Sequence, residues 1–315
     1  MADKKNIKLF LVVLIDVVLR HMKILLTVCL LFTGLASLNA QEDRMRMQQL
    51  EDEIKPLAYT IMNDDDFITR FRADSAFIRG LVRALRTPYS FGYRFDSLRN
   101  ISQLYAPDSS FRIFTWQLQM EDMNHFRQRG AIQMRTADGS LKLFPLFDVS
   151  KFTETPVDSV RNAQNWIGAV YYNIIQTKYN NRNYYTLFGY DENDARSTKK
   201  WIEVLTFDAN GAPMFGGRYF NYREDDLKPK QPAFRFCVEF KKEANAKLNY
   251  DPELDMIVLA HLVSEEGDTK KKHTLVPYGT FEGFKWLGGK WVHQPDIKEA
   301  NPDGRINPDQ TRKKQ

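Results

Sequence analysis

The chain has 315 residues, of which 43% are hydrophobic and 13% aromatic, enough apolar material for one large β domain or two smaller ones. Its 45 basic and 40 acidic residues give a net charge of +5, and the nearest thing to a basic cluster, Lys270-Lys271-Lys272, lies in a polar loop. This balance argues against a nucleic-acid partner, because nucleic-acid-binding domains concentrate Lys and Arg on one face.

Residues 1–40 are interpreted as a signal peptide. Read from Met22, a short basic start precedes an apolar run over 24–35, and small or polar residues then lead to the charged segment 42–44. This three-part pattern is typical of secretory signals, with cleavage after Ala36 or Ala40. Met22 is thus a candidate start and residues 1–21 an upstream extension; the alternative is an uncleaved N-terminal anchor. We therefore expect an exported protein of the periplasm, outer envelope or extracellular space.

The mature chain after residue 40 has no stretch of about 20 apolar residues, so no stable transmembrane helix is expected in it. It retains 40 basic and 38 acidic residues, a net charge of +2. Cys237 is its single cysteine, which excludes an internal disulfide despite export. We predict a half-buried structural thiol there.

Residues 41–105 are predicted to form a helical N-terminal segment. Apolar residues recur near a 3.6-residue period in the stretch that ends with "FIRGLVRAL". Asn63-Asp64 is a candidate N-cap, and Asp74-Ser75 is a candidate cap of a second helix after a break. Pro88 ends the run, because the residue before a proline is disfavoured in helical geometry.

Residues 106–295 are predicted to form an antiparallel β domain. The stretch "FRIFTWQLQM" alternates, and "AIQMRTADGSLKLFPLF" contains a hairpin signal at Asp138-Gly139. Two long strands flank Asn180–Asn183, and the first carries apolar residues on both faces, which indicates that both faces are covered. The remaining residues, 296–315, are polar and rich in Pro, Asn and Asp, so we expect a disordered tail.

The stretch "FGYDENDARSTKKW" is a candidate ligand site. Asp191 and Asp194 could present oxygens to Ca²⁺, but the glycine and terminal glutamate of an EF-hand loop are missing. The alternative is a hydrogen-bonded turn that leads to a short helix. Tyr184 and Tyr190 could line a pocket beside it, or be ordinary strand aromatics.

The stretch "FEGFKWLGGKWV" predicts a hairpin with a two-residue turn at Gly288-Gly289, because this turn type requires positive φ at both positions. That turn places Trp286 opposite Trp291. The pair could form a platform on which a sugar ring stacks, or could simply pack the hairpin.

Motifs for nucleotide binding, a serine nucleophile elbow and zinc hydrolysis are absent from the sequence. We expect no cofactor and no metal. Catalysis by two carboxylates stays open, since such residues need only be close in space.

Several stretches resemble a group of exported proteins from Bacteroidota to which no activity is assigned. These are "LVRALRTPYSFGYRFDSL", "APDSSFRIFTWQLQ", "WIGAVYYNIIQTKYNNRNYYTLFGYDEND", "EVLTFDANGAPMFG", "LNYDPELDMIVLAHL" and "GTFEGFKWLGGKWV". The resemblance covers residues 75–293 and implies export, without implying catalytic residues. In addition, "YAPDSSFRIFTW" resembles strand openings of TolB-type propellers.

The expected fold is α+β: an N-terminal helical segment on a large antiparallel β domain of about ten strands, in the form of a barrel, sandwich or curved sheet, with a β-propeller as the alternative. The expected function is a non-enzymatic envelope or secreted protein that binds a ligand, a glycan or a partner protein of the envelope. The alternatives are a carboxylate-dependent hydrolase outside the cytoplasm and a structural or secretion-accessory component of the envelope.

Overall fold

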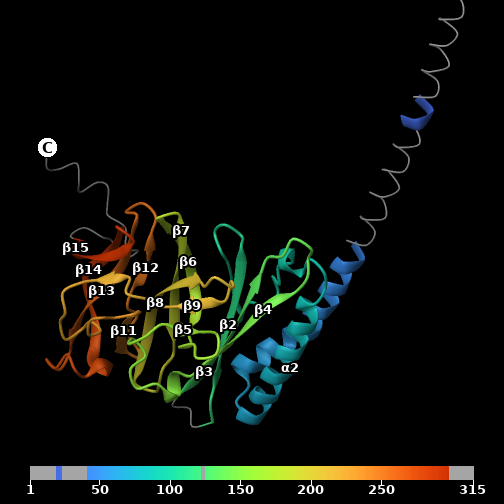
Figure 1. Ribbon diagram of the computed structural model, residues 1–315. Helices are drawn as coiled ribbons and strands as arrows, with labels where there is room; N and C mark the ends of the chain where they lie inside the picture. The colour runs from blue at the N-terminus through green and yellow to red at the C-terminus, as the bar shows by residue number, and fades with distance from the viewer. Residues whose placement is uncertain (1–18, 23–40, 122–124, 298–315) are drawn as a thin grey trace, which may run out of the picture.

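The computed structural model describes residues 19–22, 41–121 and 125–297, which form helices packed on three stacked β-sheets (Figure 1). The α+β class is confirmed. Of the arrangements considered, the sandwich is the one observed, since the sheets lie face to face and are not closed into a barrel. Most of the predicted signal peptide lies outside the described residues, as do residues 298–315 of the predicted tail.

Two helices cover one side of the molecule: residues 41–63 are helical, and α2 spans Phe67–Leu85. The N-cap of α2 is Asp66, whose carboxylate accepts a hydrogen bond from the Thr69 backbone N–H at 2.7 Å. The prediction of Asn63-Asp64 as cap is therefore wrong. Asp66 has the extended backbone that an N-cap requires.

The predicted helix break at Asp74-Ser75 is also wrong. Asp74 is fully buried in the middle of α2 and accepts hydrogen bonds from Trp116 Nε1 at 2.8 Å and Arg129 Nε at 2.9 Å. Its carboxylate ties the helix to the neighbouring sheet, because a buried charge must be paired and hydrogen-bonded to be tolerated.

The strands form sheets of four, six and five members. The four-stranded sheet has the order β1 (Ser102–Tyr105), β2 (Phe111–Gln119), β3 (Phe126–Met134), β4 (Lys142–Phe147). The six-stranded sheet has the order β5 (Arg161–Asn162), β9 (Pro213–Phe215), β8 (Ser197–Phe207), β7 (Arg182–Asp191), β6 (Val170–Tyr179), with β11 (Phe236–Lys241) also paired to β8. The five-stranded sheet has the order β10 (Phe220–Asn221), β15 (Lys290–Ile297), β14 (Leu275–Leu287), β13 (Met256–Ser264), β12 (Leu248–Asp251). Three short 3-10 helices are η1 (Ser90–Gly92), η2 (Ser150–Phe152) and η3 (Lys272–Thr274).

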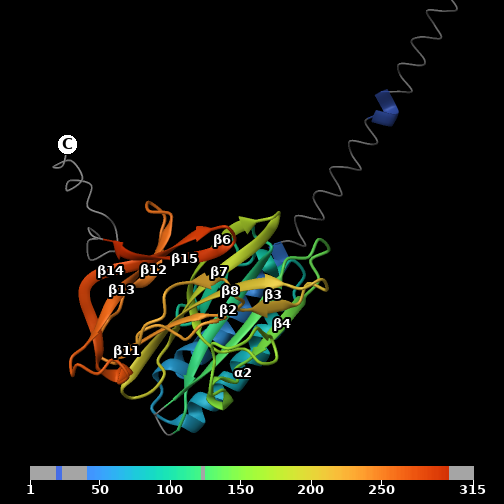
Figure 2. The same ribbon diagram turned by 60° about the vertical axis from the view of Figure 1, so that its left-hand side comes forward.

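The layers follow one another as helices, four-stranded sheet, six-stranded sheet and five-stranded sheet (Figures 1 and 2). Each interface holds one apolar cluster, so the central sheet is covered on both faces: Leu187 of β7 packs toward the four-stranded sheet and Phe188 toward the five-stranded one. On β6, Ile174 and Ile175 face the same two clusters. The prediction that this strand is covered on both sides is confirmed.

Hairpins follow the predicted turn chemistry. Trp286 lies opposite Trp291, and Gly288 and Gly289 have φ of 58° and 80°. The turn between β6 and β7 uses Asn180 and Asn181, with φ of 46° and 59°. The described residues contain fifteen strands where about ten were expected, because the shortest ones are too brief to show an alternating pattern. Cys237 is half-buried and a free thiol, as predicted.

Candidate functional site

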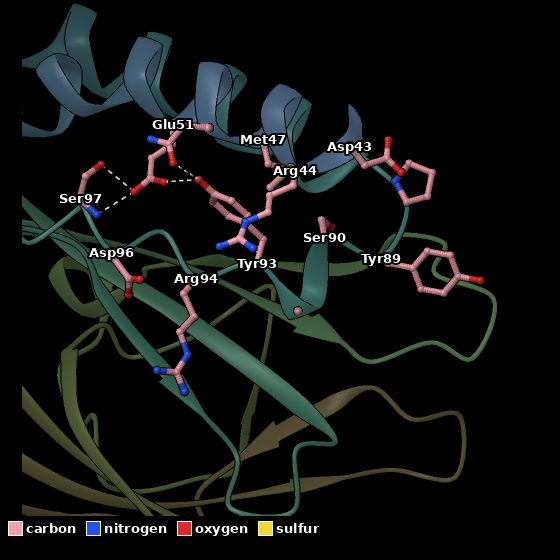
Figure 3. Close-up of a pocket in the computed structure, with 13 residues that line it drawn as sticks. Asp43, Arg44, Met47, Glu51, Tyr89, Ser90, Tyr93, Arg94, Asp96 and Ser97 are labelled. Carbon is pink, nitrogen blue, oxygen red and sulfur yellow. Dashed lines mark hydrogen bonds between the residues drawn. The ribbon is translucent and has the colours of Figure 1, made fainter. Parts of the chain in front are cut away.

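The loop between α2 and β1, residues 86–101, forms a wall of two neighbouring cavities. The helix-side cavity, about 670 Å³, lies between this loop and the start of the helix over 41–63 (Figure 3). The hairpin-side cavity, about 500 Å³, lies between the loop and the β3–β4 turn. Both have the size of small-ligand sites. Because Tyr89, Gly92 and Arg94 line both cavities, we treat the two as one site and call it the groove.

Glu51 fixes the loop against the N-terminal helix. Its buried carboxylate accepts hydrogen bonds from the Ser97 backbone N–H at 2.7 Å, the Ser97 hydroxyl at 2.6 Å and the Tyr93 hydroxyl at 2.5 Å (Figure 3). Both carboxylate oxygens are thereby occupied. Burial, and then the hydrogen bond to Glu51, raise the pKa of Tyr93 well above its usual value, so the phenol stays a donor at physiological pH.

Tyr89 stands at the junction of the two cavities in an unusual conformation. Its φ is 57°, in the left-handed region that bulky residues avoid. The ring packs over Gly139, where an added Cβ would lie 2.8 Å from ring atoms, and the Tyr89 N–H donates to the Gly139 carbonyl at 3.0 Å. Even so, 66% of Tyr89 is exposed. A strained, exposed aromatic held by its neighbours is typical of a binding site.

The hairpin-side cavity is basic. Arg94 and Arg135 line it, both are exposed, and neither guanidinium pairs with a carboxylate of the described residues. Among the described residues, no acidic side chain lines this cavity. The helix-side cavity is mixed in charge, since its lining includes three acidic and two basic residues: Asp43, Glu51, Asp96, Arg44 and Arg94.

A third arginine lies buried behind the basic wall. Arg112 of β2 is 0% exposed and donates to Gln133 Oε1 at 2.8 Å and to the Tyr105 hydroxyl at 2.8 Å, two residues that line the hairpin-side cavity. It also donates to the carbonyls of Ser90 and Tyr93 at 2.9 and 2.6 Å.

Within the described part of the chain Arg112 has no carboxylate partner. Its guanidinium instead lies over aromatic rings, the nearest being Phe114 at 4.7 Å from the centroid. Burial lowers the pKa of Arg112 to about 10, and Tyr105 opposes this shift. The group is still a cation at neutral pH. Its field reaches the cavity through a medium that screens charge less than water does.

Three of the residues predicted from sequence come together at the tip of β7. The ring of Tyr184 lies 5.5 Å from that of Trp286, which lies 5.2 Å from that of Trp291. Trp291 is 0% exposed and its indole donates to Thr186 Oγ1 at 3.0 Å. The two indoles meet at 63°, so they pack the hairpin edge to face and do not form a flat platform.

The other three predicted residues lie at the opposite end of β7. Tyr190 donates to Glu192 at 2.7 Å, and burial raises its pKa above the usual value. Asp191 is buried and accepts from Gln128 Nε2 and the Asn193 N–H, both at 2.9 Å. Asp194 accepts from the N–H groups of Arg196 and Ser197 at 2.8 and 2.9 Å.

The turn at 192–196 leads into strand β8, so the expectation of a short helix there is wrong. The local reason is that the Asp194 carboxylate accepts from the N–H groups of the second and third residues after it, in a side-chain-capped turn. The described residues contain no group of three or more side chains that could hold a metal ion.

Tyr89, Arg94, Arg112 and Arg135 were not singled out from the sequence. The available signal was local: "RTPYSFGYRF" breaks a helix and then places aromatic and basic residues in a loop. Loops on a rigid scaffold often carry binding residues.

Comparison with protein-family models, with curated proteins and with solved structures finds no match to this chain. No helix in the described ranges is long and apolar enough to cross a membrane.

Proposed function

We propose that this chain is an exported, non-catalytic binding protein and that the hairpin-side cavity of the groove holds an anionic ligand. One observation carries the proposal: Arg94 and Arg135 line a cavity without an acidic side chain, directly in front of the buried cation Arg112. Three positive charges with no described carboxylate partner attract an anion, and a partly enclosed site strengthens that attraction.

The aromatic residues that line the groove restrict the class of anion that fits it. Tyr89 offers an exposed ring at the junction, and Phe91 and Tyr105 line the basic cavity. A ring-shaped ligand with a carboxylate fits this arrangement, because its apolar face can stack while its charge meets a guanidinium fork. We therefore propose a uronate-bearing oligosaccharide as the ligand.

The hydrogen bonds of Glu51 favour a binding function over catalysis by carboxylates. General acid–base catalysis needs a carboxyl group within reach of a substrate proton. Both oxygens of Glu51 are already held by Ser97 and Tyr93, which gives this residue a role in fixing the loop.

The test is calorimetric titration of the mature chain with oligogalacturonate and with neutral oligosaccharides of the same length. We expect the acidic oligosaccharide to bind, and the Arg94→Gln/Arg135→Gln double variant to weaken its binding by about 100-fold or more, since each charge-assisted hydrogen bond contributes roughly 1.5–3 kcal/mol. Arg127→Gln removes an exposed arginine elsewhere on β3 and is the matched control. Equal binding of neutral and acidic ligands at the groove would contradict the proposal.

Export is part of the proposal and has its own test. Cell fractionation and N-terminal sequencing of the native protein should give an envelope or secreted species that begins near Ser37 or Gln41. A cytoplasmic protein that begins at Met1 would contradict export and leave the ligand proposal standing.

A second candidate, an accessory component of the envelope, is favoured by apolar side chains that the helices expose. Tyr59 and Ile68 are 64% and 48% exposed, and Met62 and Phe71 are each 41% exposed. Clustered exposed apolar residues often mark protein contacts. Cross-linking in envelope fractions, compared between the native chain and Ile68→Ser/Phe71→Ser, tests this candidate.

A further inference from the structure

A third cavity, separate from the groove, lies at the tip of β7. It measures about 540 Å³ and is lined by residues from the start of β7, the end of β8, the β8–β9 turn and the segment before β10. None of its lining residues belongs to the groove. Its volume suits one or two sugar-sized rings.

Aromatic rings form the walls of this cavity. Tyr184 and Tyr219, both half-buried, meet at 5.5 Å and 69°, and Phe207 lies on the β8 side. The Trp286 ring packs against Tyr184, with 5.5 Å between the ring centroids, and does not itself line the cavity. Rings that are only partly covered offer apolar faces to a ligand while their edges stay near water.

The rim of this cavity carries one positive and one negative side chain, Arg182 and Asp208. Arg182 is exposed and forms no ion pair with a described residue. Asp208 accepts two turn N–H groups, from Asn210 and Ala212 at 2.8 Å each, through Oδ1. Its Oδ2 has no protein partner in the described part of the chain. One donor group and one acceptor group are therefore free at the same rim.

The walls are held in place independently of any ligand. Asp108 of the β1–β2 turn accepts from the Tyr185 hydroxyl at 2.7 Å and from Asn183 Nδ2 at 3.3 Å. The Tyr219 carbonyl accepts from the Trp291 N–H at 2.7 Å, and an added Cβ at Gly217 would lie 2.2 Å from the Tyr219 ring. A site whose side chains are already fixed loses less conformational entropy on ligand binding than a mobile one does.

We propose that this cavity binds a neutral saccharide ring. A hydroxyl group both donates and accepts, so neighbouring hydroxyls can use Arg182 and Asp208 together. The C–H faces of a pyranose are apolar and match the tyrosine walls. An anion would be opposed by Asp208 and a cation by Arg182, while a wholly apolar ligand would leave both charges desolvated without partners.

The experiment is NMR titration of the mature chain with short neutral oligosaccharides built from glucose, mannose, galactose or xylose. We expect at least one series to bind at Tyr184 and Tyr219. Tyr184→Ala should weaken that binding at least tenfold, and Tyr184→Phe should retain most of it. Arg182→Gln and Asp208→Asn, which lie at the exposed rim, should each weaken it severalfold without a change in folding.

Two controls separate this site from the groove and from general damage. Tyr278→Ala removes a tyrosine that is 67% exposed and does not line the cavity, and should leave binding unchanged. Arg94→Gln/Arg135→Gln should weaken anion binding at the groove by about 100-fold or more and leave neutral saccharide binding unchanged. The proposal is overturned if no neutral series binds, if Tyr184→Ala and Arg182→Gln both bind normally, or if an acidic saccharide binds this cavity more tightly than its neutral counterpart.

Discussion

Glu51 and Arg112, buried residues of opposite charge, hold opposite ends of Tyr93 without touching each other. Glu51 accepts the Tyr93 hydroxyl at 2.5 Å, and Arg112 donates to the Tyr93 carbonyl at 2.6 Å. One residue comes from the N-terminal helix and the other from β2. The loop that lines the groove is thus held from both sides by buried charged side chains. Because one of them belongs to the helical layer and the other to the four-stranded sheet, the shape of the loop depends on the folding of both layers.

Arg112→Met should destabilise the protein and weaken anion binding together. The substitution removes a costly buried charge, but it also removes the donor to the Tyr93 carbonyl and the donor to Gln133 Oε1. The Ser90 carbonyl keeps its hydrogen bond from the Tyr93 N–H at 3.0 Å. Each unsatisfied buried group costs about 1–3 kcal/mol, so we expect a net loss of roughly 2–4 kcal/mol in urea denaturation. Oligogalacturonate affinity should fall although Arg112 does not reach the ligand. Arg127→Met, on the exposed face of β3, is the control and should change neither quantity.

A double-mutant cycle on Glu51 and Tyr93 measures how strongly the helix holds the loop. Glu51→Gln can still accept from Ser97 but offers the Tyr93 hydroxyl a poorer partner, and Tyr93→Phe removes that hydroxyl. We expect about 1–2 kcal/mol of destabilisation for each single variant and a coupling free energy of roughly 1 kcal/mol, determined by urea denaturation. Additive effects would show that the short contact contributes nothing.

Tyr89→Gly should separate stability from binding. Glycine adopts a φ of 57° freely, so the substitution relieves backbone strain of about 1–3 kcal/mol while it loses the packing of the ring on Gly139. The free energy of unfolding should stay within about 1 kcal/mol of the native value, but anion affinity should fall at least tenfold. Tyr89→Phe keeps the ring and should keep most of the affinity. Normal affinity in Tyr89→Gly would remove Tyr89 from the site.

The layer arrangement could be predicted in part, because the pattern of apolar residues along a strand shows which of its faces are buried. The stretch over β2 has apolar residues on both faces, and the structure places Ile113 and Phe114 in different clusters. The turn between β14 and β15 could also be predicted from sequence, since Gly288-Gly289 favours a single type of two-residue turn. The position of Asp74 could not be predicted from sequence. Aspartate usually caps helices, but Asp74 lies inside one because Trp116 and Arg129, far along the chain, donate hydrogen bonds to it.

The groove could not be predicted from sequence for a related reason. Its character depends on Arg112 having no carboxylate nearby, and on Arg94 and Arg135, which are 41 positions apart, meeting at one cavity. Periodicity within a strand carries no information on such pairings. The aromatic residues chosen from sequence were partly informative: Tyr184 lines a cavity, whereas Trp291 is enclosed by the sheets.

The hairpin glycines offer a matched pair of substitutions. Gly288 and Gly289 both have positive φ, so an alanine at either should cost about 1 kcal/mol of backbone strain. An added Cβ meets nothing within 4 Å at Gly288, but at Gly289 it lies 2.5 Å from the Tyr179 ring. Gly289→Ala should therefore be the more destabilising by roughly 1–3 kcal/mol in thermal denaturation. Equal effects would mean that Tyr179 does not pack on this turn.

Asp191 and Asp194, three positions apart in one turn, should respond to pH in opposite directions. Burial is the largest influence on Asp191 and raises its pKa to about 6, against the opposing effects of the Asn193 N–H and Lys199. The folded state then holds this proton more tightly than the unfolded state does, so the stability that Asp191 contributes is present below about pH 4 and is lost as the pH rises to about 6. For Asp194, burial is outweighed by the N–H groups of Arg196 and Ser197, and its pKa is lowered. Its contribution is present above its usual pKa and is lost as the pH falls.

Urea denaturation from pH 4 to pH 8 tests this difference. Asp191→Asn should flatten the fall in stability between pH 4 and 6, with a gain on the order of 2–3 kcal/mol over the native chain at pH 7, since one pKa unit corresponds to about 1.4 kcal/mol. Asp194→Asn should instead destabilise the protein at every pH from 4 to 8, because the contribution of Asp194 is lost only as the pH falls below its usual pKa of about 4. If the Asp191→Asn curve ran parallel to the native one, the Asp191 carboxyl would have an ordinary pKa. The effect of burial on the Asp191 pKa would then have to be offset by the charge of Lys199, which favours the ionised carboxylate.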